Sequence, residues 1–147
     1  MASTVTATTL TSIITESITL NGDTYGNSVT HSATTQGEAY SRTMEVATSE
    51  TGVLTMGAAD GSGTVIGDNV SYMRFTNLDD TNFMQLTFKT AAENFSVKLS
   101  AGESYVCMNN QMDAVNTVTQ GTLEDMTSVT AKANTLACDL QFIVISS

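Results

Sequence analysis

A single histidine, His31, limits the catalytic chemistry that this sequence can carry. Catalysis by a serine or cysteine nucleophile commonly uses a histidine as the general base, so it would have to pass through His31. The neighbours Thr30 and Ser32 form no recognisable nucleophile motif, and the Gly-x-Ser-x-Gly pattern is absent. Carboxylate pairs of the kind found in glycosidases are defined by spatial separation, which the sequence does not give. We therefore expect a protein that is not an enzyme.

Two short stretches are rich in the oxygen ligands that calcium prefers, Asp60–Gly63 and Asn77–Asn82. Neither matches the twelve-residue calcium loop, which needs regularly spaced acids and a closing glutamate. Turn formation explains both stretches without an ion. We expect no cofactor and no metal, and calcium at a surface loop remains the alternative.

The two cysteines, Cys107 and Cys138, show no Cys-x-x-Cys pattern and no companion histidine at ligand spacing. A metal site is therefore not indicated. We expect each cysteine to be a small buried apolar residue. A disulfide between them is the alternative, and only spatial geometry decides it.

The charge of the chain excludes two classes of partner. Its formal net charge is −10, with only five Lys and Arg residues, whereas binding a phosphate backbone needs clustered basic side chains. The same negative charge opposes docking on an anionic membrane surface. The longest purely apolar run, Phe142–Ile145, is too short to span a bilayer, and residues 1–6 lack the features of a secretory signal. We expect neither nucleic acid nor a membrane as partner.

Alternation of apolar and polar residues with a period of two is the strongest structural signal. In the segment Leu10–Leu20, the residues Leu10, Ile14, Ile18 and Leu20 have one parity and hydroxyl residues the other, until Asn21-Gly22-Asp23 ends the predicted strand. The other predicted strands are Arg42–Thr48, Val53–Met56, Val70–Asn77, Phe83–Thr90, Phe95–Leu99, Ser104–Met108 and Cys138–Ser147. The last has apolar residues on both sides, which predicts a strand covered on both faces. Asn109–Gly121 fits a strand and a helix equally well and stays unassigned.

Short connections rich in turn formers predict that neighbouring strands pair as antiparallel hairpins. The predicted pairs are Arg42–Thr48 with Val53–Met56, Val70–Asn77 with Phe83–Thr90, and Phe95–Leu99 with Ser104–Met108. Many short strands without long helical patterns predict an all-β, antiparallel two-sheet sandwich. A jelly roll is the first interpretation. An immunoglobulin-like sandwich is the second, although the tryptophan and flanking cysteine pair of its antibody members are missing.

The first residues differ from the rest, because Met1–Thr9 is nearly all Ala, Ser and Thr. Such a stretch can lie as an extended arm on the sheet edge of another chain, and a frayed terminus is the alternative. We predict an extended N-terminal arm over residues 1–10 and a single β-sandwich domain over residues 11–147. The methionines near the unassigned segment and the acidic turn are further candidates for an interface. The candidate interface residues are Ala2, Ser3, Thr4, Val5, Thr6, Ala7, Thr8, Thr9, Asp79, Asp80, Met108 and Met112.

Three stretches carry a resemblance to a known group of proteins: Glu16–Gly22, Tyr72–Phe83 and Phe95–Ser104. The central one is the most specific, with a strand ending in Arg-x-Thr-Asn-Leu-Asp, a tight polar turn and a returning strand. A strand with an Ala-Gly-Glu corner follows it. Together these stretches resemble small virion structural proteins of tailed bacteriophages, especially those that infect marine bacteria and cyanobacteria.

The resemblance implies a β-sandwich or jelly-roll protein that acts as a capsid cement or decoration protein. Such a protein binds the outer surface of the shell, clamps neighbouring major capsid subunits and often forms trimers, so the implied partners are the major capsid protein and copies of itself. The implied location is the virion, after assembly in the host cytoplasm with Cys107 and Cys138 reduced. The alternative is a tail or fibre-associated β-sandwich that binds a host receptor or a carbohydrate.

Overall fold

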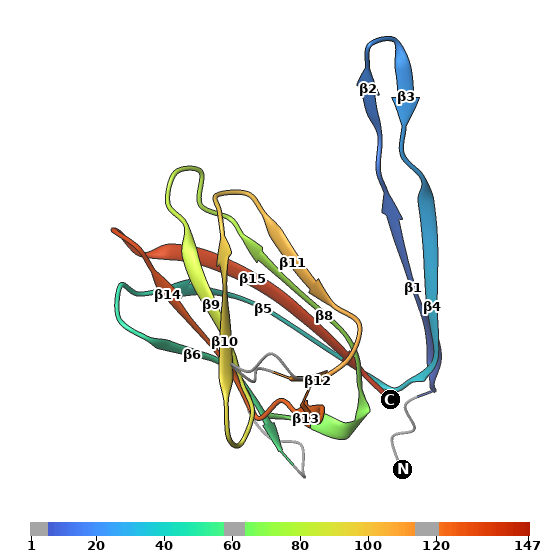
Figure 1. The fold of residues 1–147 in the computed structure, drawn as a ribbon. Coiled ribbons are helices and arrows are strands. Elements are labelled where there is room, and N and C mark those ends of the chain that lie inside the picture. Colours follow the sequence, from blue (N-terminus) through green and yellow to red (C-terminus); the bar gives the residue numbers. More distant parts are fainter. Residues whose placement is uncertain (1–5, 58–63, 114–120) are drawn as a thin grey trace.

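The alternating segments fold as strands that form two packed sheets and a projecting hairpin (Figure 1). The computed structural model describes residues 6–57, 64–113 and 121–147. The strands are β1 (Thr8–Thr15), β2 (Ile18–Leu20), β3 (Asp23–Tyr25), β4 (Ser28–Gln36), β5 (Glu38–Val46), β6 (Thr51–Gly57), β7 (Thr64–Ile66), β8 (Val70–Asn77), β9 (Met84–Lys89), β10 (Asn94–Leu99), β11 (Ser104–Cys107), β12 (Gln111–Met112), β13 (Glu124–Asp125), β14 (Ser128–Ala133) and β15 (Cys138–Ser146). A single 3-10 turn, Gly67–Asn69, precedes β8.

The sandwich consists of a five-stranded sheet in the order β10-β9-β14-β6-β7 and a four-stranded sheet in the order β11-β8-β15-β5. The short strand β7 runs parallel to β6, and the other neighbours in these two sheets are antiparallel. The predicted all-β antiparallel sandwich is therefore confirmed. The small pair β12–β13 lies beside one end of it (Figure 1).

The eight long strands of the sandwich pair in a nested order. The first, β5, pairs with the last, β15, and β6 pairs with β14. In the same way β8 pairs with β11, and β9 pairs with β10 at the centre of the nest. This is the strand order of a jelly roll. An immunoglobulin-like sandwich has its first and last strands in different sheets, so the second interpretation does not describe this chain.

The three predicted local hairpins are wrong, although the strands themselves are where the sequence predicts them. The members of each pair, β5 and β6, β8 and β9, and β10 and β11, lie in different sheets. Their short connections cross the gap of about 10 Å between packed sheets instead of joining neighbours in one sheet. In both arrangements the apolar residues of the two strands face the same core, so alternation alone does not distinguish them.

An aromatic contact joins the two sheets. The rings of Phe75 in β8 and Phe88 in β9 meet edge to face with centroids 5.7 Å apart. Phe142 in β15 stacks on Phe75 at 6.0 Å, and Phe95 in β10 stacks on Phe88 at 5.1 Å. The Phe75, Phe88 and Phe142 side chains are fully buried. Because such rings bury large areas and add favourable edge and stacking contacts, this cluster is the centre of the core.

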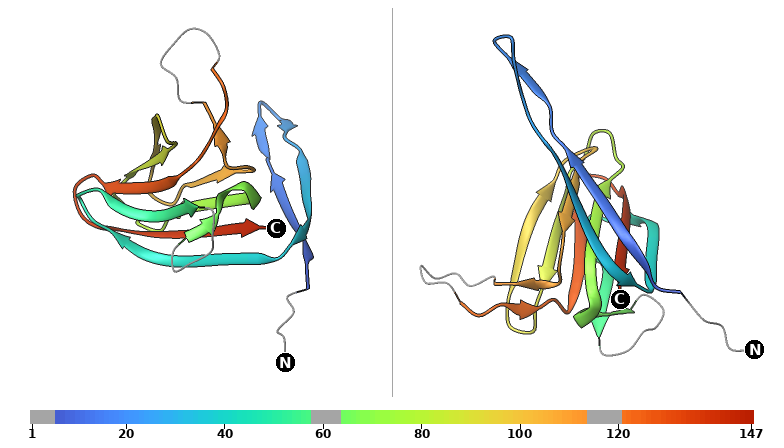
Figure 2. Two further views of the ribbon diagram at one scale, coloured as in Figure 1. Left: turned by 90° about the horizontal axis from the view of Figure 1, so that it is seen from below. Right: turned by 90° about the vertical axis from the view of Figure 1, so that its right-hand side faces the viewer.

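The segment before β5 leaves the sandwich as one long hairpin, which we call the arm (residues 6–36; Figures 1 and 2). β1 pairs with β4 and β2 with β3 in one continuous register, from Leu10 opposite Ala33 to Leu20 opposite Asp23. The connecting turn, Asn21-Gly22, has φ angles of 53° and 91°, as a type I′ turn requires. The sandwich therefore begins at Glu38 and not at residue 11, because alternation identifies a strand but not the sheet that it joins.

We predict that Phe75→Ala lowers the free energy of unfolding by about 3–5 kcal/mol, because it opens a cavity between the sheets. Phe83→Ala is the matched control, with an expected loss of about 1 kcal/mol, since the Phe83 side chain is 36% exposed. Urea unfolding measures both changes. If Phe75→Ala does not fold, Phe75→Leu is expected to lose about 1–2 kcal/mol. Similar losses for the core and surface variants would contradict this account of the core.

Candidate interaction surfaces

The arm has two chemically different faces. Its register places apolar side chains from both strands on one face, which we call the apolar face. The apolar face is named for Leu10, Ile14, Ile18, Leu20, Tyr25, Val29 and Ala33, and the same register also places Ser12, Glu16, Asp23 and His31 on it. The opposite, hydroxyl face carries Thr and Ser, and cross-strand contacts join Thr15 to Ser28 at 3.1 Å and Thr19 to Thr24 at 3.4 Å. Ile13 is the one large apolar residue on the hydroxyl face. The parity predicted for Leu10–Leu20 is therefore confirmed.

The sandwich covers only the base of the apolar face. Leu10 and Ala33 are half-buried there, beside a cavity of about 200 Å³ that Ser71 and Met108 of the sandwich also line. Further out, Ile14 and Val29 are 41% and 44% exposed. Near the tip the exposed fractions of Ile18, Tyr25 and Leu20 are 59%, 54% and 57%. A two-stranded hairpin alone is marginally stable in water, and a contiguous exposed apolar face of this kind makes the arm a candidate interaction surface.

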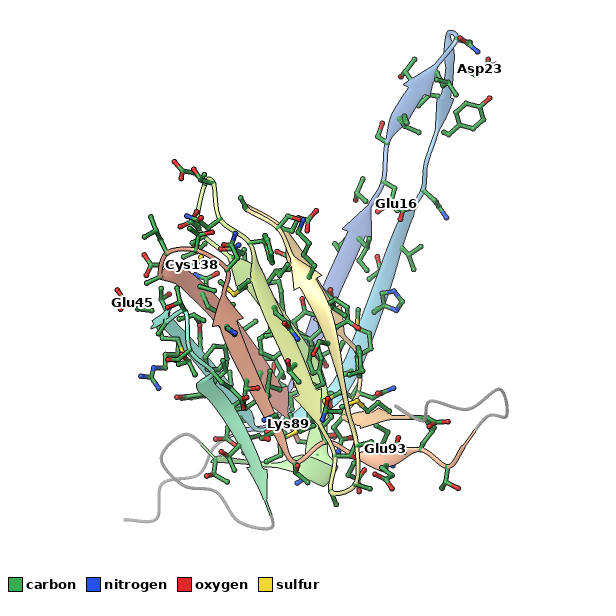
Figure 3. All side chains as sticks on the ribbon, turned by 60° about the vertical axis from the view of Figure 1, so that its left-hand side comes forward. Glu16, Asp23, Glu45, Lys89, Glu93 and Cys138 are labelled. Carbon is green, nitrogen blue, oxygen red and sulfur yellow. The ribbon has the colours of Figure 1, made fainter. Side chains whose placement is uncertain are left out.

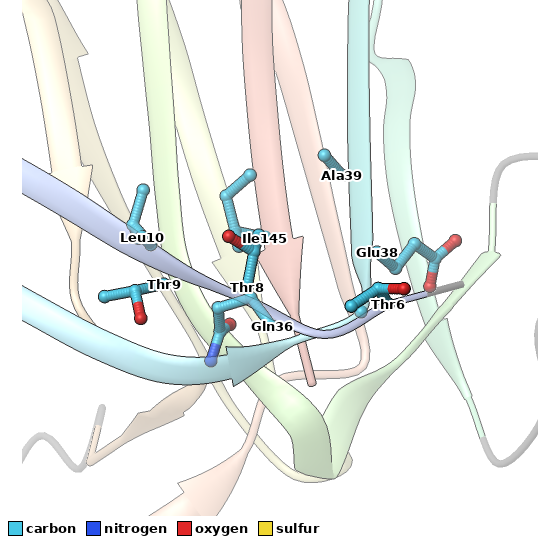
Figure 4. A pocket seen from close by; sticks show the side chains of 9 residues that line it. Thr6, Thr8, Thr9, Leu10, Gln36, Glu38, Ala39 and Ile145 are labelled. Carbon is cyan, nitrogen blue, oxygen red and sulfur yellow. The ribbon is translucent and has the colours of Figure 1, made fainter. Parts of the chain in front are cut away.

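The junction between arm and sandwich is strained. Thr35 has a φ of 62°, in the left-handed region that a β-branched residue rarely adopts. Gln36 is 5% exposed, and its Nε2 donates to the Thr34 carbonyl at 2.7 Å, but its Oε1 has no hydrogen-bond partner. Figure 4 shows this junction, where Ile145 and Leu10 help to line a cavity of about 300 Å³. Each feature costs on the order of 1–3 kcal/mol, so the junction is locally unfavourable for these two groups.

A second exposed apolar surface lies at the end of the sandwich where β8 connects to β9 and β14 to β15. Leu78, Phe83 and Leu136 are 49%, 36% and 66% exposed there. Backbone hydrogen bonds hold the two loops together, from Leu78 N–H to the Asp139 carbonyl at 2.8 Å and from Asn134 N–H to the Phe83 carbonyl at 3.1 Å. Four carboxylates and one cation lie at this end, the Lys98 ammonium being 4.6 Å from the centre of the Phe83 ring, and we call the whole surface the loop-end patch. Its acidic rim consists of Asp79, Asp80, Glu103 and Asp139.

Asp79 organises the β8–β9 loop. One carboxylate oxygen accepts the backbone N–H of Asn82 at 2.6 Å and that of Thr81 at 2.8 Å, and these bonds lower the pKa of Asp79. The buried Asn77 completes the turn, since its Nδ2 donates to the Asn82 and Leu99 carbonyls and its Oδ1 accepts the Asp79 N–H. The oxygen ligands of the Asn77–Asn82 stretch are thus partly committed to the turn itself.

Among the residues that the structure describes, no group of three or more His, Cys, Asp or Glu is placed to hold a metal ion. The other stretch considered for calcium, Asp60–Gly63, lies outside the described residues. His31 is exposed on the arm opposite Ser12.

Cys138 is buried, as expected, whereas Cys107 is only partly buried, and both are free thiols. Burial raises the pKa of the Cys107 thiol to about 11, which disfavours the reactive thiolate.

The candidate interface residues that the structure describes lie in three different places. Ala2–Val5 lie outside the described residues, whereas Thr6–Thr9 are exposed at the base of the arm. Met108, 38% exposed, lies beside the same base, and Asp79 and Asp80 lie in the loop-end patch. Met112 requires a correction, because it is 8% exposed and packs in the core, where its side chain offers no surface to a partner.

Sequence reasoning missed the return strand of the arm and the leucines of the loop-end patch. A signal for the arm is present, because Asn21-Gly22 separates two hydroxyl-rich segments of similar length, as in a hairpin with a two-residue turn. Its apolar residues Tyr25 and Val29 are too widely spaced to form a distinct pattern of their own. Leu78 and Leu136 are 58 positions apart in the sequence, and only the fold brings them to one end.

Comparison with known proteins adds no family to this geometry: the chain matches no protein-family model, no curated protein and no solved structure. No helix within residues 6–57, 64–113 and 121–147 is long and apolar enough to cross a membrane. The two exposed apolar surfaces are therefore the features that bear on function.

We predict that Asp79→Asn destabilises the fold at neutral pH and that this loss shrinks in acid. Because the folded pKa of Asp79 lies below the ordinary value of 3.8, its carboxylate stabilises the fold fully above that pH, and the contribution disappears as pH falls through the lower folded value. Unfolding free energies of both proteins, measured from pH 7 into the acid range, test this. Asp80→Asn is the control, since Asp80 accepts the Thr81 hydroxyl and not the backbone N–H groups that Asp79 holds. A constant difference across pH would contradict the assignment.

Proposed function

We propose that this protein is a non-enzymatic structural component of a virion, a capsid cement or decoration protein that binds the outer surface of the major capsid shell. The observation that carries the proposal is the presence of two separate uncovered apolar surfaces, the apolar face of the arm and the loop-end patch, on one chain of 147 residues. A protein with one docking surface attaches to one partner, whereas two surfaces on different elements can link two molecules. Linking neighbours is the task of a cement protein.

The loop-end patch has the anatomy of a docking surface for a basic partner. Its apolar centre and charged rim follow the usual arrangement of a protein interface, in which apolar anchors are surrounded by polar groups. The rim is predominantly acidic, with Lys98 as a cation among four carboxylates, and the whole chain has a net charge of −10. A partner with a basic rim around an apolar pocket would complement it, and charge complementarity favours fast and selective docking. In this proposal that partner is the major capsid protein.

Repetition on a lattice supports the same function, because many weak contacts act together. A patch with three exposed apolar anchors gives a modest affinity for one site. When copies of the protein are also joined to one another, binding of the next patch becomes effectively intramolecular, and the avidity of the assembly exceeds the affinity of one contact. A small acidic protein that links to its own copies can therefore stabilise a shell. Assembly in the host cytoplasm, with both cysteines reduced, belongs to this proposal.

The test is co-sedimentation of the purified protein with empty shells of the tailed phage to whose virion the protein is proposed to belong. We expect Leu136→Ser to weaken binding about tenfold, since it removes the most exposed apolar anchor of the patch, and Asp80→Lys to weaken it further at low salt. Rising salt should weaken binding of the unchanged protein. Glu93→Lys is the matched control and should bind normally, because Glu93 lies at the opposite end of the sandwich from Cys138 (Figure 3).

Failure of the unchanged protein to sediment with shells would overturn the cement function. Binding to tails or to a glycan array instead would support the alternative, a tail or fibre-associated β-sandwich that recognises a host receptor or carbohydrate. Equal loss for Glu93→Lys and Asp80→Lys would mean that general charge, and not the loop-end patch, drives docking.

A further inference from the structure

We infer that the apolar face of the arm is a self-association surface, which packs against the same face of a second copy of this chain. This inference concerns copies of this chain alone and holds whether or not the virion function is correct. It assigns the arm and the loop-end patch to different partners. The arm joins copies to one another, and the loop-end patch remains available to a different molecule.

The geometry of the arm keeps its apolar face from being covered within one chain. The arm leaves the sandwich at the strained Thr35 and diverges from it toward its tip (Figures 1 and 2). Only the base, at Leu10 and Ala33, approaches the sandwich, near Met108. Ile14, Val29 and the residues beyond them continue the same face into solvent. Only another molecule can cover that part of the face.

The face fits a copy of itself because both strands contribute to it in register. Ile14 lies opposite Val29, and Ile18 lies opposite Tyr25. Two such ribbons can pack with their apolar faces together, like the inner faces of two sheets, and leave both hydroxyl faces in water. A contact of one patch with its own copy is the commonest way in which oligomers close with symmetry.

Charge singles out the arm as the place where two copies of this acidic protein can approach. Residues 6–36 contain two acids, Glu16 and Asp23, and no Lys or Arg, so the other 13 of the 15 acids lie elsewhere in the chain. Figure 3 shows Glu16 in the middle of the arm and Asp23 at its tip. Contact through any acidic loop would bring many like charges together, whereas contact through the apolar face of the arm brings together only Glu16 and Asp23 of each copy, which share that face by register. Added salt should therefore strengthen self-association, which is opposite to its predicted effect on binding to a basic shell.

The area available predicts a moderate affinity. The exposed parts of Ile14, Ile18, Leu20, Tyr25 and Val29 amount to roughly 400–500 Å² per copy, if a whole large side chain exposes about 150–250 Å². Two copies would bury about 900 Å² in total, near the lower limit of about 1,000–1,200 Å² for specific interfaces. We therefore expect an oligomer that forms with rising concentration.

The experiment is light scattering on the full chain over a wide concentration range, at low and at moderate salt. The unchanged protein should exceed the monomer mass of 15.5 kDa, more so at the higher salt. Ile14→Thr with Val29→Thr should return it to the monomer, with at least a tenfold weaker association. Ile13→Thr is the matched control, since the neighbouring Ile13 is 62% exposed but lies on the hydroxyl face, and it should leave the mass unchanged. Threonine is β-branched and keeps the strand preference at these positions, so the arm should still form.

A monomer at all concentrations would overturn the inference, and so would equal effects of the Ile13 and the Ile14/Val29 variants. Co-sedimentation with shells separates this inference from the proposed function. An Ile14/Val29 variant that stays monomeric but still binds shells through the loop-end patch would support both. An unchanged protein that is monomeric in solution and loses shell binding on the Ile14/Val29 change would assign the apolar face to the capsid instead.

Discussion

The edge-to-face contact between Phe75 and Phe88 is the interaction on which the rest of the molecule depends. Phe75 belongs to the four-stranded sheet and Phe88 to the five-stranded sheet, so their contact holds together two sheets that the chain crosses repeatedly. The β8–β9 connection joins the strands that carry these rings. Packing at this point therefore also helps to fix the loop-end patch, whose apolar centre lies on that connection and on the β14–β15 connection beside it.

The arm, in contrast to the sandwich, has no core of its own. Apart from its base, the arm has one face rich in hydroxyl groups and one on which exposed aliphatic and aromatic groups predominate. Thr35 and Gln36 join the arm to the sandwich at an energetic cost. A segment with this pattern gains stability chiefly from contact with another molecule.

The distribution of charge then separates the roles of the two surfaces. The acids concentrate on the sandwich and its loops, whereas the arm carries Glu16 and Asp23 alone. Contact between two copies is least unfavourable through the arm, and contact with a basic partner is most favourable through the loop-end patch. Under the two proposals, association through the arm would strengthen with salt, whereas docking through the loop-end patch would weaken.

The sequence by itself determined the strands and their inward faces, because alternation depends only on local backbone geometry. It thus predicted the all-β sandwich, the jelly roll as first interpretation and the buried positions of Met73 and Phe75. It could not determine which strands pair, because a turn such as Leu78–Phe83 can join neighbours in one sheet or cross between sheets. Only the tertiary structure decided that Leu10–Leu20 belongs to a projecting arm, that Met112 is in the core, and that the loops of Leu78 and Leu136 lie at the same end of the sandwich. Each of these depends on contacts between residues distant in sequence, which no local pattern records.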